Sequence, residues 1–172
     1  TIPGFSWQEK REIPEFFSSL SEIVEIHVIP GNHDGELIQE IESIDNVYID
    51  DIRGIMAGPL GIMHGHTHPG RGLEGAEILV MGHQHPSASI VDSSGIKCRM
   101  PIFLRLVVND YSPYPWLRSV KYVYILPAFN DLPPGHLLYP GSTGIGPLFT
   151  SGFLSLDNKV NIFLVSKSTQ SL

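Results

Sequence analysis

The sequence predicts an α/β protein in which short buried strands carry polar loops at their carboxyl ends. Three observations support this class: an amphipathic segment near the N-terminus, brief runs of Ile, Val, Leu and Met of strand length, and histidine-rich patches directly after three of these runs. The chain has 172 residues, the size of one ordinary domain. We therefore expect a single domain over residues 1–172 with a hydrophobic core of its own.

The first third of the chain predicts alternating helices and strands. Residues 6–22 place Trp, Ile, Phe and Leu near helical spacing, and Ser6 with Glu9 forms a capping-box pattern at the start of this helix. The elements expected next are a strand over 24–29, a short helix over 36–42, a strand over 46–49, and strands over 52–57 and 60–63 that meet at the Gly58-Pro59 turn.

The remainder of the chain is predicted to be mostly β. A glycine-rich loop covers 70–75, and the expected strands are 77–81, 88–91, 97–108, 120–125, 153–156 and 160–165, before a polar tail over 166–172. Two proline-rich connectors, 109–118 and 127–147, separate these strands. Long irregular loops of this kind either cover a site or an edge of the fold, or are solvated connectors.

Composition excludes several classes of protein. Cys98 is the only cysteine, which rules out an internal disulfide and fits a reducing compartment. No signal peptide is recognisable, and no apolar stretch approaches the roughly 18–20 residues that span a bilayer. We expect a cytoplasmic protein without a membrane partner. The net charge of -7 argues against broad affinity for nucleic acid, although bound divalent cations would reverse the sign of the charge locally.

Histidines carry the strongest chemical signal. Six of the eight fall in three patches: Gly31-Asn32-His33-Asp34, His64-Gly65-His66-Thr67-His68 and Gly82-His83-Gln84-His85. Each patch follows an apolar run, and the carboxyl edge of the strands is where α/β sheets bind ligands. Neutral imidazole is the commonest side-chain ligand of transition metals. The sequence therefore predicts that three distant segments deliver imidazoles to one metal site, whereas the lone His27 and His136 are interpreted as structural.

Taken in order, Gly-Asn-His-Asp, a histidine that closes a strand, and Gly-His-x-His after a further strand resemble the second half of the calcineurin-like metallophosphoesterases. Longer stretches of the sequence are similar to the branch described as Icc-like or SbcD-related predicted phosphoesterases. These stretches are residues 1–12, 64–69, 81–86 and 125–131. The resemblance implies a calcineurin-like αββα sandwich with mixed sheets and two divalent metal ions. Manganese is the expected ion, with iron, zinc and nickel as alternatives.

The resemblance also implies a set of metal ligands. Carried over position by position, Asn32, His64 and His83 correspond to ligands of one ion, and His85 corresponds to a ligand of the other. The family pattern begins with Asp-x-His and Gly-Asp motifs, and neither occurs in this sequence. We therefore expect an N-terminal β-α-β unit, with the bridging carboxylate, to be missing from this chain, and the chain alone to be inactive or nearly so.

The same resemblance assigns catalytic roles. His33 resembles the catalytic histidine that faces the scissile phosphate and stabilises or protonates the leaving oxygen, and Asp34 the carboxylate that orients it. His66 is expected to support a ligand or to face the substrate. For His68 two positions stay open, the rim of the site and the solvent. For Arg71 two roles stay open, contact with a substrate phosphate and simple solvation.

The expected function is metal-dependent hydrolysis of a phosphoester by metal-activated water, as a phosphodiesterase or nuclease acting on nucleic acid or a nucleotide. Two alternatives stand beside it. One is a non-catalytic protein-binding scaffold with the same fold. The other is a structural or storage zinc site, although such sites are usually closed and rich in cysteine. The sequence leaves the oligomeric state open.

Overall fold

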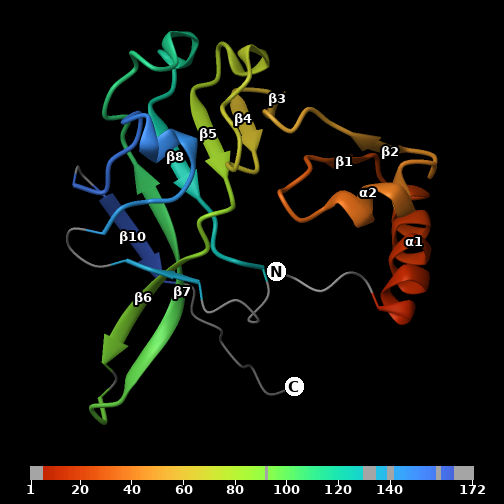
Figure 1. Ribbon diagram of the computed structural model, residues 1–172, viewed down its shortest axis with the longest axis horizontal. Helices are drawn as coiled ribbons and strands as arrows, with labels where there is room; N and C mark the ends of the chain where they lie inside the picture. Colours follow the sequence, from red (N-terminus) through yellow and green to blue (C-terminus); the bar gives the residue numbers. More distant parts are fainter. Residues whose placement is uncertain (1–5, 92, 130–134, 139–141, 158–159, 165–172) are drawn as a thin grey trace.

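The computed structural model describes the chain except residues 1–5, 92, 130–134, 139–141, 158–159 and 165–172. The fold is mixed α/β, as predicted: a two-stranded sheet with two helices forms the N-terminal unit, and an eight-stranded mixed sheet forms most of the rest (Figure 1). Two predicted segments lie outside the described residues: residues 1–5 of the N-terminal sequence that resembles the family, and the polar tail over 166–172.

The N-terminal unit contains α1 (Trp7–Ser21), β1 (Ile26–Val28), α2 (Gly35–Ile41) and β2 (Val47–Ile49). β1 and β2 pair in parallel. α1 begins with the predicted capping box, in which the Ser6 hydroxyl accepts from the Glu9 amide and the Glu9 carboxylate accepts from the Ser6 amide. β1 is shorter than predicted, because Val24 lies before it in a bend and is 48% exposed.

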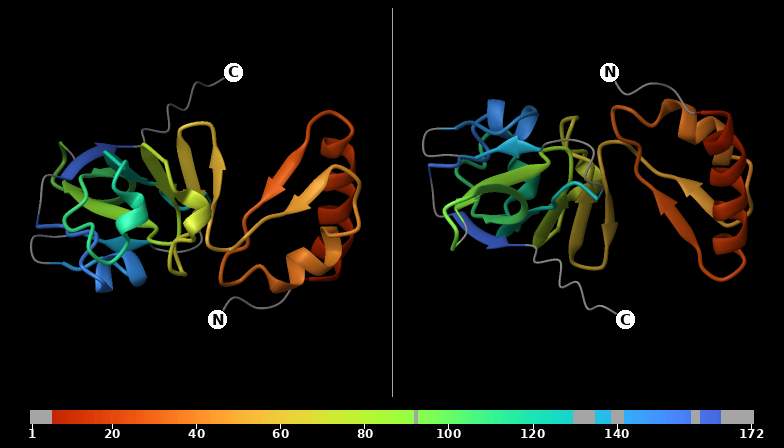
Figure 2. Two further views of the ribbon diagram at one scale, coloured as in Figure 1. Left: turned by 90° about the horizontal axis from the view of Figure 1, so that it is seen from above. Right: turned by 90° about the horizontal axis from the view of Figure 1, so that it is seen from below.

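The predicted apolar face of α1 is not buried at its largest side chains. Trp7 is 93% exposed and Phe16 is 61% exposed, and Ser21 is the buried residue of the helix. α1 lies on the side of the small sheet that faces away from the large one (Figure 2). Helical spacing shows that apolar side chains share a face, but it does not show that another element covers that face.

The large sheet has the strand order β3-β4-β5-β8-β7-β6-β9, with β10 paired to β7. Its strands are β3 (Ile55–Ala57), β4 (Leu60–Met63), β5 (Ile78–Met81), β6 (Pro86–Val91), β7 (Lys97–Leu106), β8 (Tyr122–Ile125), β9 (His136–Leu137) and β10 (Val160–Leu164). β3 and β4 form the hairpin predicted at Gly58-Pro59, and β4, β5 and β8 run parallel. β7 pairs with β6 through its first half and with β8 and β10 through its second half.

Three short helices lie where the sequence predicted loops. They are η1 (Arg71–Leu73), η2 (Pro115–Leu117) and α3 (Pro147–Thr150). The strand predicted over 153–156 is wrong: this segment forms bends, yet Phe153 and Leu154 are buried. Its apolar residues fill the core from a loop, so their hydrophobicity reports burial rather than strand pairing. Part of the predicted 127–147 connector lies outside the described residues.

One hydrophobic core lies against the parallel strands. It gathers buried side chains from β4, β5, β7, β8, η2 and the segment after α3. Tyr114 packs edge-to-face on Phe153, with the ring centroids 5.3 Å apart, and Leu117 is fully buried. The 109–118 connector therefore packs on the core and is not merely a solvated connector.

His27 is a surface residue of β1. Its Nδ1 lies 2.9 Å from Asp50 Oδ2 and its Nε2 lies 2.9 Å from Glu25 Oε1. The ring stacks on Tyr48, with the centroids 5.3 Å apart. The hydrogen bond to the Glu25 carboxylate, followed by that to Asp50, raises the pKa of His27.

This raised pKa makes stability depend on pH in a definite direction. The contribution of His27 is fully present below its unfolded-state pKa and is lost as pH rises through the folded-state pKa. We expect the difference in free energy of unfolding between the native protein and His27→Gln to shrink as pH rises from about 5.5 to 8. Urea denaturation at a series of pH values measures it, and a difference that does not change with pH would contradict the ion pair.

No helix in the described part of the chain has both the length and the apolar character needed to cross a membrane.

Candidate metal centre

Two parallel strands bring two of the histidine patches to the same edge of the large sheet. β4 ends at Met63, directly before His64, and β5 ends at Met81, two residues before His83. Met63 and Met81 are partners in the strand register. The imidazoles of His64 and His83 consequently lie close together, with ring centroids 5.2 Å apart.

The third patch reaches this edge from the N-terminal unit, in the loop after β1. Asn32 Oδ1 lies 3.2 Å from His64 Nε2. Gly31 permits this approach, because a Cβ there would lie 2.8 Å from His64 Cε1 and 2.9 Å from Asp34 Oδ2. A larger residue at position 31 would push the loop away from the imidazole.

The three patches line one pocket. Its volume is about 370 Å³, and it is lined by Gly31, Asn32, His33, Asp34, His64, His83 and His85. All the residues that the sequence put forward as ligands or catalytic groups therefore come together, as the strand-end argument predicted. Their roles as ligands and catalytic groups stay predictions.

His66 belongs to the same cluster without lining the pocket. Its ring centroid lies 5.1 Å from that of His64 and 6.1 Å from that of His83. Its Nδ1 is buried and, among the described residues, makes no hydrogen bond. The ring thus neighbours both candidate ligands, and its supporting role stays a prediction.

His68 and Arg71 lie outside the pocket lining. His68 is exposed and its Nδ1 lies 2.8 Å from Tyr114 Oη. The guanidinium carbon of Arg71 lies 5.0 Å from the ring centroid of Trp116. Both side chains therefore interact with the connector that covers the core.

Burial favours the neutral form of the two central imidazoles. Burial, followed by the proximity of His83 and His66, lowers the pKa of His64 to about 4. Burial, followed by the proximity of His66 and His85, lowers the pKa of His83. A neutral imidazole has a free lone pair, which is the form that binds a metal ion.

The predicted contact from Asp34 to His33 is not formed. Asp34 Oδ2 accepts a hydrogen bond of 2.7 Å from the Gly31 amide, and no hydrogen bond joins Asp34 to His33 within the described residues. A carboxylate beside a tight loop takes the nearest free backbone N–H, as Asp commonly does in turns. Asp34 therefore closes the loop that carries Asn32 and His33.

Sequence reasoning overlooked Gln84, which lies between two candidate ligands. It is only 4% exposed, and its side-chain amide bonds to the backbone of Ile145. His83 and His85 on either side have positive φ values of 64° and 43°. A polar residue flanked by two candidate ligands was the signal that the sequence offered.

The pocket gathers side-chain oxygen and nitrogen atoms of the kinds that bind divalent ions. No group of three or more His, Cys, Asp or Glu side chains that could hold a metal ion occurs among the described residues. Asn32 Oδ1 lies 3.2 Å from His64 Nε2 and lines the same pocket as His83, and amide oxygen and imidazole nitrogen are donors that Mn, Fe, Zn and Ni accept. For a second ion the described residues offer His85.

No protein-family model matches the chain, and no curated protein matches it. Among solved structures it is similar to the crystal structure of Pseudomonas putida nuclease MPE, at 20% sequence identity and a TM-score of 0.49. The match covers 78% of this chain and 54% of the nuclease chain, so the chain spans about half the length of that protein.

Proposed function

We propose that the protein is a metal-dependent phosphoesterase in which Asn32, His64 and His83 hold one divalent ion and His85 serves a second. The convergence of these four side chains and His33 on one pocket supports this proposal. Manganese is the proposed ion, with iron, zinc and nickel as alternatives. The proposed substrate is a phosphodiester, in nucleic acid or a nucleotide, as the family resemblance implies.

When bound, divalent ions polarise the phosphoryl group and lower the pKa of water. The chain's own residues do the rest. The low pKa of His64 leaves its nitrogen available to a cation instead of a proton. His33 lines the same pocket, so it can stabilise charge on the leaving oxygen or donate a proton to it. No step is assigned to His85, whose partner ligands the described residues do not supply.

His33 provides the direct test of catalysis. We expect His33→Ala in the full gene product to lower kcat for bis-p-nitrophenyl phosphate with Mn²⁺ by about 10²- to 10⁴-fold, because a positioned acid–base group contributes about that much. Mn²⁺ affinity, measured by isothermal titration calorimetry, should stay at the native value, because the substitution leaves the proposed ligands in place.

His68→Ala is the matched control, since it removes an imidazole outside the pocket lining. It should leave kcat unchanged. Equal turnover by the native protein and His33→Ala would refute the catalytic assignment. A native protein that binds no Mn²⁺ would refute the proposed function and favour the protein-binding scaffold.

A further inference from the structure

The turn that carries two candidate ligands is strained. The Gln84 amide donates a hydrogen bond of 2.7 Å to the Gly82 carbonyl, across His83 with its φ of 64°. This is a γ-turn of the rarer kind, in which the central residue has positive φ. Side chains other than glycine enter this region at a cost in free energy, so surrounding contacts must hold the turn.

The buried side chain of Gln84 supplies such contacts. Its Oε1 accepts a hydrogen bond of 2.7 Å from the Ile145 amide, and its Nε2 donates to the Ile145 carbonyl. Both polar groups of the side chain are therefore paired with both polar groups of one residue. Such a two-point contact fixes orientation as well as distance.

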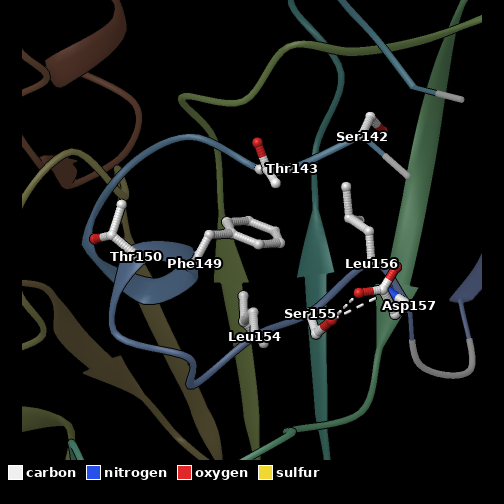
Figure 3. Close-up of a pocket in the computed structure, with 9 residues that line it drawn as sticks. Ser142, Thr143, Phe149, Thr150, Leu154, Ser155, Leu156 and Asp157 are labelled. Atoms are coloured by element: carbon white, nitrogen blue, oxygen red, sulfur yellow. Dashed lines mark hydrogen bonds between the residues drawn. The ribbon is translucent and has the colours of Figure 1, made fainter. Parts of the chain in front are cut away.

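The segment that Gln84 binds, Thr143–Gly146, is itself anchored, and we call it the strap. The Thr143 carbonyl lies 3.0 Å from His136 Nε2. Gly144 lies directly against the ring of Phe149, where a Cβ would overlap the ring. Phe149 projects from α3 beneath the strap and toward Leu156 (Figure 3). The strap is therefore held in place by its own contacts, so it can fix the position of the turn that Gln84 joins to it.

The strap also reaches the candidate site. A Cβ at Gly146 would lie 2.9 Å from the Gly65 carbonyl and 3.6 Å from His83 Cδ2. Gly146 has a φ of 86°, which glycine adopts without strain. On the other side of the turn, the His136 amide donates a hydrogen bond of 2.7 Å to the His85 carbonyl. The turn is thus held on one side by the strap and on the other side by the His136 amide.

We propose that Gln84 is a positioning residue of the candidate metal centre: by fixing the strap to the Gly82–His85 turn, it holds the imidazoles of His83 and His85 in the orientation that binds metal. The inference rests on the proposed function. It adds a residue that touches neither metal nor substrate and acts only through the two histidines.

Co²⁺ is the probe, because its visible absorption reports ligand geometry. Gln84→Met in the otherwise native protein keeps the side-chain volume close to that of Gln and removes both hydrogen bonds. We expect a 10- to 100-fold loss of Co²⁺ affinity, about the usual effect of removing a residue that orients a ligand, together with a changed absorption spectrum. Hydrogen exchange at the Ile145 amide should become faster, since its acceptor is gone.

Ser21→Ala is the matched control. Ser21 is 7% exposed in α1 of the N-terminal unit, and its hydroxyl donates a hydrogen bond of 3.0 Å to the Ser18 carbonyl. It should change neither Co²⁺ affinity nor Ile145 exchange. Gln84→Asn, which keeps the amide and shortens its reach, carries the test if Gln84→Met does not fold.

The outcomes separate the two proposals. Faster exchange at Ile145 with native Co²⁺ affinity and spectrum would overturn the positioning role and leave the proposed function standing. A native protein that binds no Co²⁺ would overturn the proposed function, and the positioning role with it.

Discussion

Replacing His64 with alanine is expected to abolish metal binding, and with it any phosphodiesterase turnover. His64 is the central donor of the cluster: its Nε2 lies 3.2 Å from Asn32 Oδ1, and its ring neighbours those of His66 and His83. Removing it leaves Asn32 and His83 without the side chain between them. Two remaining donors fall short of the three protein ligands usual in catalytic metal sites.

Co²⁺ titration and turnover of bis-p-nitrophenyl phosphate measure both consequences. His68→Ala is again the control, because it removes an imidazole from the same loop without touching the pocket lining. Should His64→Ala bind Co²⁺ with native affinity, the assignment of the three-residue ligand set would be wrong, whatever the role of His33.

The second large effect concerns stability. We expect Phe153→Ala to lower the free energy of unfolding by about 3–5 kcal/mol, because removing a fully buried phenyl ring loses its transfer free energy and leaves a cavity. Phe153 is fully buried and packs edge-to-face on Tyr111 and Tyr114. The total free energy of unfolding of a natural domain is only about 5–15 kcal/mol, so this substitution would remove a large share of the stability.

Phe16→Ala makes the same chemical change at a side chain that is 61% exposed on α1. It should cost at most about 0.5 kcal/mol, as surface substitutions usually do. Urea denaturation of both variants gives the comparison. Equal losses would show that the segment after α3 does not belong to the core.

The sequence predicted the convergence of the histidines because that inference depended on strand ends alone. The β4 and β5 runs were recognisable from composition, and parallel pairing in register then fixed His64 and His83 at one edge. The same argument brought the patch with His33 to this site, and the resemblance to a known family supplied the roles of Asn32 and His33. No pattern in the sequence required that loop to cross to the large sheet.

Side-chain partners were harder to predict because they depend on loop geometry. Asp34 bonds to Gly31 within its own loop instead of to His33. Gln84 bonds to a residue 61 positions away, and no local spacing indicates such a contact. The strand predicted over 153–156 failed for a related reason: an apolar run reports burial, and a loop can bury Phe153 as completely as a strand can.

The pocket joins two parts of the chain that share no sheet. Asn32 and His33 follow β1 of the small sheet, whereas His64 and His83 follow strands of the large one. A cation bound by residues of both parts would link them only in the folded protein. By mass action, the melting temperature would then rise with cation concentration. A chelator would remove the cation, and the N-terminal unit would then be the first part of the fold to lose its attachment to the large sheet.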